Sequence, residues 1–142
     1  LAKKSDIMLV VETGNNAMIT SCFLGRKLID DLKTKHLKVL WDPANALYCG
    51  ENPSKNALDS MEGGYLGHVH MKDVEVAIHQ AKIKCVALGE GQMSPHLQTI
   101  ADRLNDIDYD GSMSLESVYR PSEGDFEDGF NASITKFKNL YS

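Results

Sequence analysis

Short apolar runs alternate along the chain with longer stretches of helical spacing. The apolar runs fall at 7–11, 37–41, 67–71 and 112–115, and the helical stretches at about 20–35, 54–61, 94–104 and 125–140. The first run, Ile7 to Val11, is apolar without interruption, which is typical of a strand covered on both faces in a parallel sheet. The alternation of strand and helix predicts right-handed crossovers and one parallel sheet. Residues 74–92 fit neither pattern and are expected to be an irregular insertion.

The third apolar run carries polar side chains at every second position. Two-residue alternation places His68, His70 and Lys72 on one face of this strand, with Val69 and Met71 on the other. A strand that ends in imidazoles and a charged loop is typical of a metal or acid–base site on an α/β scaffold. The plain alternative is a solvent-facing strand with two incidental histidines.

A residue that can bind a metal stands at or near the end of each predicted strand. These residues are Glu12, Asp42, His70 and Glu116. The first two intervals between them are 30 and 28 residues, and the third is 46. A β/α barrel uses about 31 residues for each of its eight units, so two intervals match and the third exceeds it by about the length of the insertion. The sequence therefore predicts an α/β fold of parallel (β/α) units of a TIM barrel, with four ligands at one rim.

The two-residue period also predicts which side chains of the first strand line the barrel. With Glu12 inward, Met8 and Val10 face inward as well, and Leu9 and Val11 face the helices. By the same reasoning the serines of the 112–115 strand line the interior together with Glu116.

Composition limits the classes of function that the chain can have. The 142 residues form one predicted domain, 1–142, with 42% hydrophobic and 25% charged residues. The net charge of −5 argues against nucleic acid or an anionic membrane as a partner. No apolar run approaches the roughly 20 residues that span a bilayer. Cys22, Cys49 and Cys85 are far apart, which predicts reduced thiols in a cytoplasmic protein.

Two glutamates, an aspartate and an imidazole form a mixed oxygen and nitrogen donor set without a thiolate. Such a set favours Mn²⁺, Mg²⁺ or Co²⁺, and is also compatible with Zn²⁺. Glu12 and Glu116 each have a second oxygen that can shuttle a proton, and Lys72 is a candidate for polarising a substrate oxygen. Each side chain alone would be ordinary: a carboxylate at a helix start or an aspartate in a turn. Their coincidence at four strand ends favours the metal site.

Five segments together resemble the xylose-isomerase-like TIM-barrel superfamily, and within it the sugar phosphate isomerases/epimerases and inosose-type enzymes. They are Glu12-Thr13, Trp41 to Asn45, His68 to Asp73, Gly89-Glu90-Gly91 and Leu115-Glu116. The resemblance covers nearly the whole chain but only strands five to eight, the C-terminal half of the barrel.

The resemblance implies roles for individual residues. Glu12, Asp42, His70 and Glu116 fall on the family's metal ligands, with Mn²⁺ as the expected ion, and the two glutamates would be the acid/base pair. Asn45, His68 and Glu90 are the expected substrate contacts. Asn45 stands where some members carry a histidine, which weakens the interpretation as a three-metal endonuclease.

The resemblance implies a divalent-metal-dependent isomerase or epimerase acting on a small-molecule sugar or sugar phosphate. Three alternatives remain open: an inosose-type dehydratase with the same metal site, a truncated non-catalytic barrel, and a phosphodiesterase acting on damaged DNA. Four units cannot close a barrel. An N-terminal half barrel or a second chain in a homo-oligomer is therefore expected to complete the fold.

Overall fold

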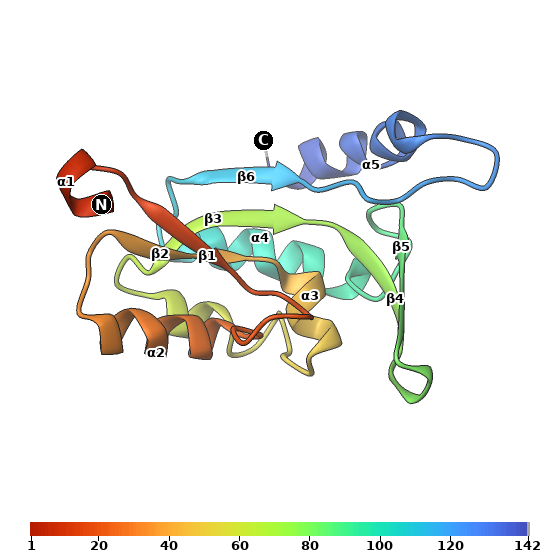
Figure 1. The fold of residues 1–142 in the computed structure, drawn as a ribbon. Coiled ribbons are helices and arrows are strands. Elements are labelled where there is room, and N and C mark those ends of the chain that lie inside the picture. The colour runs from red at the N-terminus through yellow and green to blue at the C-terminus, as the bar shows by residue number, and fades with distance from the viewer. Residues whose placement is uncertain (142) are drawn as a thin grey trace.

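Four short strands form one parallel sheet in the structure, a computed structural model that describes residues 1–141 (Figure 1). The strands are β1 (Leu9–Glu12), β2 (Leu37–Trp41), β3 (Leu66–Met71) and β6 (Ser112–Leu115). They lie in the order β1-β2-β3-β6, and every neighbouring pair is parallel. The predicted parallel α/β architecture is confirmed.

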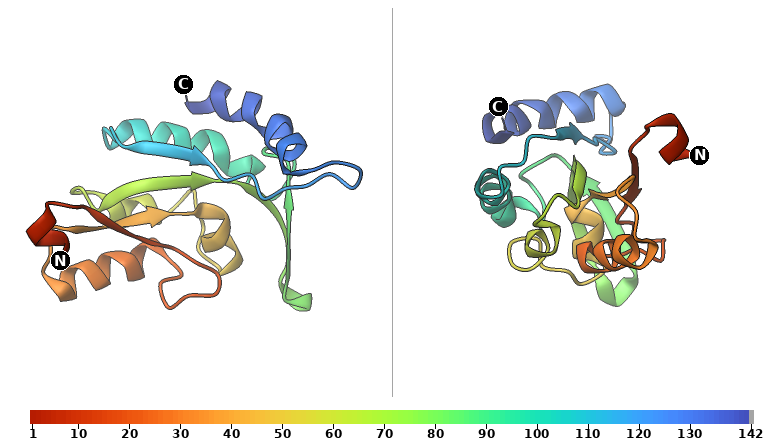
Figure 2. Two further views of the ribbon diagram at one scale, coloured as in Figure 1. Left: turned by 45° about the horizontal axis from the view of Figure 1, so that its top comes forward. Right: turned by 90° about the vertical axis from the view of Figure 1, so that its left-hand side faces the viewer.

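Helices cover one face of this sheet and leave the other face open, as the right-hand view of Figure 2, which looks along the strands, shows. The main helices are α2 (Cys22–Leu32), α4 (Leu97–Asp106) and α5 (Phe126–Tyr141), together with the 3₁₀ turn η1 (Leu58–Met61). The hydrophobic core lies between the sheet and these elements. Val39, Trp41, Val69 and Met71 point into it from the two central strands and are fully buried. Burial of such side chains is the main stabilising contribution to the fold.

The opposite face of the strands is less buried, as the two-residue alternation requires. His68 and His70 on β3 are only partly buried, between the buried Val69 and Met71. On β1, the expectation of burial on both faces is wrong: Leu9, expected to face the helices, is 50% exposed, and Val10 is 43% exposed. The reason is that β1 is one of the two outer strands of the sheet and is also covered incompletely on its inner face.

A bulge in β3 adjusts the register between the two central strands. Val39 pairs with Leu66 and Leu40 with His68, so Gly67 has no partner of its own. A Cβ atom at Gly67 would lie 2.7 Å from Lys38 Cβ and 2.9 Å from Val10 Cγ1. The absence of a side chain at Gly67 therefore permits the close packing of β1, β2 and β3 beneath the rim.

The segment expected to be irregular contains an antiparallel hairpin. Its strands are β4 (Asp73–Ala77) and β5 (Lys82–Val86), joined by the 3₁₀ turn η2 (Ile78–Gln80), and the hairpin projects from the carboxyl end of β3 in Figure 1. The prediction of an irregular region is wrong for 74–86. The following loop, 87–93, leads into the 3₁₀ turn η3 (Ser94–His96) and then α4.

Two further differences concern helices. The short helix α3 (Pro43–Tyr48), which the sequence pattern did not predict, begins directly after Asp42. Asp42 is its N-cap and accepts a hydrogen bond from the Asn45 N–H at 2.9 Å, while Pro43 occupies the first turn, where proline is favourable. The helix expected at 54–61 is only the 3₁₀ turn η1, and a one-turn helix, α1 (Ala2–Ser5), precedes β1.

No helix within residues 1–141 has both the length and the apolar character needed to cross a membrane.

Candidate metal centre

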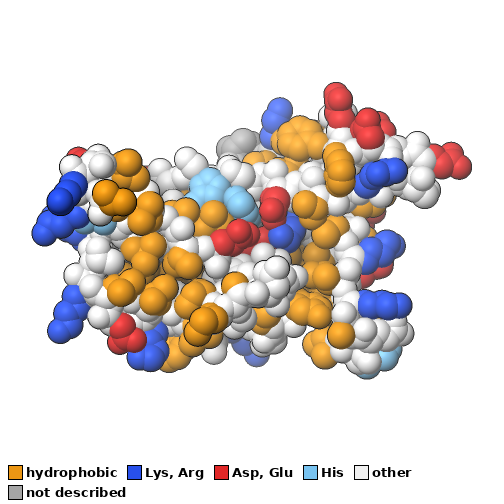
Figure 3. All heavy atoms as spheres, viewed as in Figure 1, with side chains coloured by type: hydrophobic (Ala, Val, Ile, Leu, Met, Phe, Trp, Pro, Cys, Tyr) orange, Lys and Arg blue, Asp and Glu red, His pale blue; other side chains and the backbone are white. Residues whose placement is uncertain are grey.

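The carboxyl ends of the four parallel strands bring together the four residues that the sequence singled out. Glu12 ends β1, Asp42 follows β2, His70 lies near the end of β3 and Glu116 follows β6. One ligand atom from each lies within 4.8 Å of the others. Figure 3 shows histidine, acidic and basic side chains gathered in the middle of the viewed face, with hydrophobic side chains on either side. The predicted meeting of these residues at one rim is confirmed.

His70 presents an unused nitrogen to the carboxylates. Its Nδ1 atom lies 3.5 Å from Glu12 Oε1 and 3.8 Å from Glu116 Oε2. This nitrogen is buried and has no hydrogen-bond partner among the described residues. Because a buried nitrogen without a partner carries a desolvation cost, its position among acidic oxygens suits a cation better than a packing role. The residues present therefore fit a divalent metal ion.

Lys72 lies between two of these carboxylates. Its Nζ atom is 2.6 Å from Asp42 Oδ2 and 2.5 Å from Glu116 Oε2, and its side chain is 11% exposed. Burial works against the charge on Lys72, but the two carboxylates keep the pKa of the ammonium above its ordinary value. Burial likewise works against the charge on Glu116, but the hydrogen bond from Lys72 keeps the pKa of this carboxyl below its ordinary value.

Asp42 is held in place by a small hydrogen-bond network. Thr13 Oγ1 accepts a hydrogen bond from the Asp42 N–H at 2.9 Å and donates to the Asp42 carbonyl at 3.3 Å. The Asn45 side-chain amide donates to the Thr13 carbonyl at 3.1 Å. All three residues are buried, and burial raises the pKa of Asp42 to about 6 even though Lys72 is close. The network fixes the Asp42 carboxylate at the rim.

Of the expected substrate contacts, Asn45 and His68 lie around the cluster. Asn45 is buried in the network with Thr13, and His68 bonds through Nε2 to Ser114 Oγ at 2.9 Å. The rings of His68 and His70 meet edge to face with centroids 5.2 Å apart. Burial, together with the neighbouring His70, lowers the pKa of His68. Their assignment as substrate contacts stays a prediction.

Glu90, the third expected substrate contact, lies in the 87–93 loop and is exposed. In the part of the chain that the structure describes, no hydrogen bond or ion pair links it to the cluster. Its role also stays a prediction.

Sequence reasoning missed the contribution of Asp73. This carboxylate is 1% exposed and accepts four backbone hydrogen bonds. Oδ1 accepts from Val74 and Met93 at 2.8 Å each, and Oδ2 accepts from Gly89 at 2.9 Å and Gly91 at 3.0 Å. The signal for this contact was the pair of glycines around Glu90, because a Cβ at Gly91 would collide with the Asp73 carboxylate. Asp73 ties the loop to the start of the hairpin, next to Lys72.

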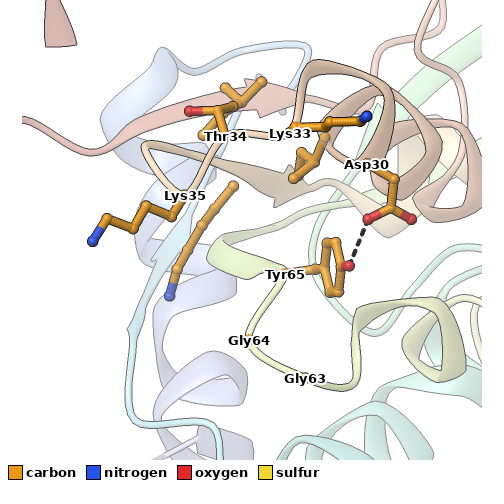
Figure 4. A pocket seen from close by; sticks show the side chains of 10 residues that line it. Asp30, Lys33, Thr34, Lys35, Gly63, Gly64 and Tyr65 are labelled. Atoms are coloured by element: carbon orange, nitrogen blue, oxygen red, sulfur yellow. Dashed lines mark hydrogen bonds between the residues drawn. The ribbon is translucent and has the colours of Figure 1, made fainter. Parts of the chain in front are cut away.

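A separate hollow lies at the opposite end of the strands. It has a volume of about 470 Å³ and is lined by the segments that lead into β2 and β3, including Lys33, Lys35 and Tyr65 (Figure 4). The Tyr65 hydroxyl donates to Asp30 Oδ1 at 2.6 Å. None of the predicted site residues lines this hollow.

Comparison with known proteins gives one family and several similar structures. The family model described as xylose isomerase-like TIM barrel matches residues 1–139. A comparison with curated proteins gave no match. A xylose isomerase domain protein from Planctomyces limnophilus is 22% identical, with a TM-score of 0.74 over 98% of this chain and 46% of that chain.

Two enzymes share the fold to a similar degree. The 3-keto-D-glucoside 4-epimerase from E. coli is 19% identical, with a TM-score of 0.74 over 97% of this chain and 48% of its own. A probable 3-DHS dehydratase from Bacillus anthracis is 17% identical, with a TM-score of 0.75 over 96% of this chain and 51% of its own. The chain thus spans about half the length of these structures. The chain belongs to the xylose isomerase-like TIM barrel family, and its four parallel β/α units correspond to about half of such a barrel.

Proposed function

We propose that the chain carries the metal centre of a divalent-metal-dependent isomerase or epimerase of a sugar. The reaction would move a proton at a carbon next to a carbonyl group. The observation that carries the proposal is the meeting of Glu12, Asp42, His70 and Glu116 within 4.8 Å. The family match and the similarity in fold to an epimerase support an enzyme of this class.

The charge of the cluster suits a divalent cation. Three carboxylates and the Lys72 ammonium leave two negative charges uncompensated when the histidines are neutral. Oxygen ligands with a single imidazole and no thiolate favour Mn²⁺, Mg²⁺ or Co²⁺ over a structural zinc ion, and Mn²⁺ is our proposed ion. When bound, the ion would polarise the carbonyl of a sugar and stabilise the negative charge of its enediolate.

The two glutamates are placed to exchange a proton with the substrate. They come from the outer strands of the sheet, Glu12 from β1 and Glu116 from the end of β6, so they flank the cluster from both sides. The Glu12 side chain is 42% exposed and can remove a proton from one face of a sugar carbon. On the other side, the ionised Glu116 can pass to the substrate a proton that it takes from the Lys72 ammonium. Lys72 can donate a hydrogen bond to the substrate oxygen.

The loops above the rim favour an unphosphorylated sugar. Barrel enzymes commonly bind phosphate with backbone N–H groups in the last βα-loops and at the N-terminus of a helix. Here the N–H groups of Gly89, Gly91 and Met93 in the 87–93 loop donate to Asp73. The N-terminus of α5 is occupied in the same way, because the N–H groups of Glu127 and Asp128 donate to Asp125 Oδ1. The protein's own carboxylates therefore fill both positions.

We also infer that further β/α units cover the open face of the sheet. β1 and β6 are outer strands, and apolar side chains such as Val10 are exposed on β1. The N-terminal half of a longer barrel or a second copy of this chain would supply these units. Light scattering of the purified chain separates the two, since a mass of twice one chain supports the second copy and a monomer supports the longer barrel.

Proton exchange tests the proposed reaction most simply. The chain is incubated in D₂O with Mn²⁺ and a ketohexose, and ¹H NMR follows deuterium entry at the carbon beside the carbonyl. Exchange requires only removal and return of a proton, so it can be detected even where turnover is slow. We expect exchange that depends on the metal, and mass spectrometry should find no loss of water. Loss of water would instead identify the dehydratase.

A matched pair of variants assigns the exchange to the site. Glu116→Gln keeps the shape of the side chain and removes its charge, so exchange should fall about 10²-fold or more, which is the usual contribution of a positioned acid or base. Glu123→Gln alters an exposed glutamate outside the cluster and should exchange like the wild type. Equal exchange by Glu116→Gln and wild type, or exchange without metal, would contradict the proposal.

A further inference from the structure

Lys72 and a bound metal ion would compete for the same oxygen atoms. The ammonium contacts Asp42 Oδ2 and Glu116 Oε2, and both residues belong to the four that can hold an ion. Its ammonium thus forms ion pairs with two of the three carboxylates of the cluster. The wild-type chain therefore carries a built-in cation at the centre.

Burial explains why this cation is needed. The Asp42 side chain is fully buried, and an ionised carboxylate without a counter-charge is very unfavourable there. The network of Thr13 and Asn45 satisfies backbone groups of the segment but provides no positive charge. Lys72 supplies that charge when no metal ion is bound.

The same ammonium opposes a divalent ion. A cation that bound the same carboxylates would lie within a few ångströms of Nζ, where like charges repel strongly in a partly buried site. The backbone of Lys72 cannot move far, because it lies between the end of β3 and Asp73. Four backbone hydrogen bonds hold Asp73 in place.

We propose that Lys72 is an internal counter-cation that shares Asp42 and Glu116 with the metal ion and so limits the metal affinity of the centre. This inference rests on the proposed metal centre. It predicts two effects of opposite sign when the charge is removed: tighter metal binding and lower stability of the metal-free protein. A lysine that merely held the ligands in place would give weaker metal binding and lower stability together.

Calorimetric titration with Mn²⁺ distinguishes these outcomes. Lys72→Met keeps the aliphatic stem and removes the charge, and we expect its dissociation constant to fall at least tenfold. Lys72→Arg keeps the charge and should remain within about threefold of the wild type. Lys84→Met is the matched control, because Lys84 is 72% exposed and pairs with Glu75 on the hairpin. It should bind Mn²⁺ like the wild type.

Thermal unfolding provides the second measurement. In EDTA, Lys72→Met should unfold at a lower temperature than the wild type and Lys84→Met, and saturating Mn²⁺ should remove most of this difference. Unchanged or weaker Mn²⁺ binding by Lys72→Met would overturn the inference while leaving the metal centre intact. A wild-type chain that binds no Mn²⁺ would overturn both this inference and the proposed function.

A measurement on the wild type covers the case in which Lys72→Met does not fold. With ¹³C at the lysine Cε atoms, addition of Mg²⁺ should shift the signal of Lys72 and leave that of Lys84 in place. No shift at Lys72 under saturating Mg²⁺ would overturn the inference.

Discussion

Replacing Asp73 by asparagine should destabilise the protein strongly without changing its shape. The asparagine keeps one oxygen acceptor but places an amide NH₂ where the second oxygen accepts two backbone hydrogen bonds. In either orientation of the amide, two of the four N–H groups of Val74, Gly89, Gly91 and Met93 lose their acceptor. Each buried N–H left without a partner costs about 1–3 kcal/mol, so the free energy of unfolding should fall by about 4 kcal/mol.

Urea unfolding measures this loss. The protein has a single tryptophan, Trp41, which is fully buried and reports unfolding through its fluorescence. Asp73→Asn should lower the unfolding midpoint with little change in the dependence on urea, because the surface exposed on unfolding is the same. Asp31→Asn is a suitable control, since this aspartate is exposed and pairs with the exposed Lys27, and it should cost about 0.5 kcal/mol or less. A loss below about 1 kcal/mol for Asp73→Asn would refute the reasoning.

Three other predictions concern the site and its support. Mn²⁺ should bind more weakly at pH 5 than at pH 7, because burial raises the pKa of Asp42 to about 6 and protons compete for this ligand as the pH falls; titrations giving equal affinity would contradict this. Gly67→Ala should cost about 1–3 kcal/mol in urea unfolding, since the added Cβ would lie 2.7 Å from Lys38 Cβ, and an unchanged midpoint would argue against the close packing. With Mn²⁺ bound, paramagnetic broadening should detect a ketohexose at least as well as its phosphate ester. Preferential binding of the ester would contradict the proposal that the protein's own carboxylates occupy the phosphate-binding N–H groups.

The strand ends could be predicted from the sequence because they depend on local patterns. Alternation of polar and apolar residues put His70 and Lys72 on one face, and the spacing of Glu12, Asp42 and His70 matched repeated β/α units. In a parallel sheet these ends must meet at one edge, so residue numbers alone led to a spatial cluster. The sequence did not predict which cluster residues Lys72 contacts, because these contacts depend on side-chain positions across three strands.

The hairpin and the hydrogen bonds between the 87–93 loop and Asp73 depend on contacts that the residue pattern does not specify. Ala81 takes the left-handed conformation (φ 50°) at the hairpin turn, a position where glycine or asparagine usually signals a turn. The partners of Asp73 are backbone N–H groups up to 20 residues away, and the two glycines around Glu90 are the sign of this contact in the sequence. The exposure of Leu9 depends on what pairs with the outer edge of β1. Helix α3 was missed because Asp42-Pro43 suits a turn as well as a helix start.

Diffraction from crystals soaked in Mn²⁺, with data collected where manganese scatters anomalously, tests the metal centre most directly. We predict one strong anomalous peak in contact with His70 Nδ1 and with oxygens of Glu12, Asp42 and Glu116, and the Lys72 ammonium displaced from at least one carboxylate. Soaked crystals with no peak at this rim, and with Lys72 still bridging Asp42 and Glu116, would contradict the account.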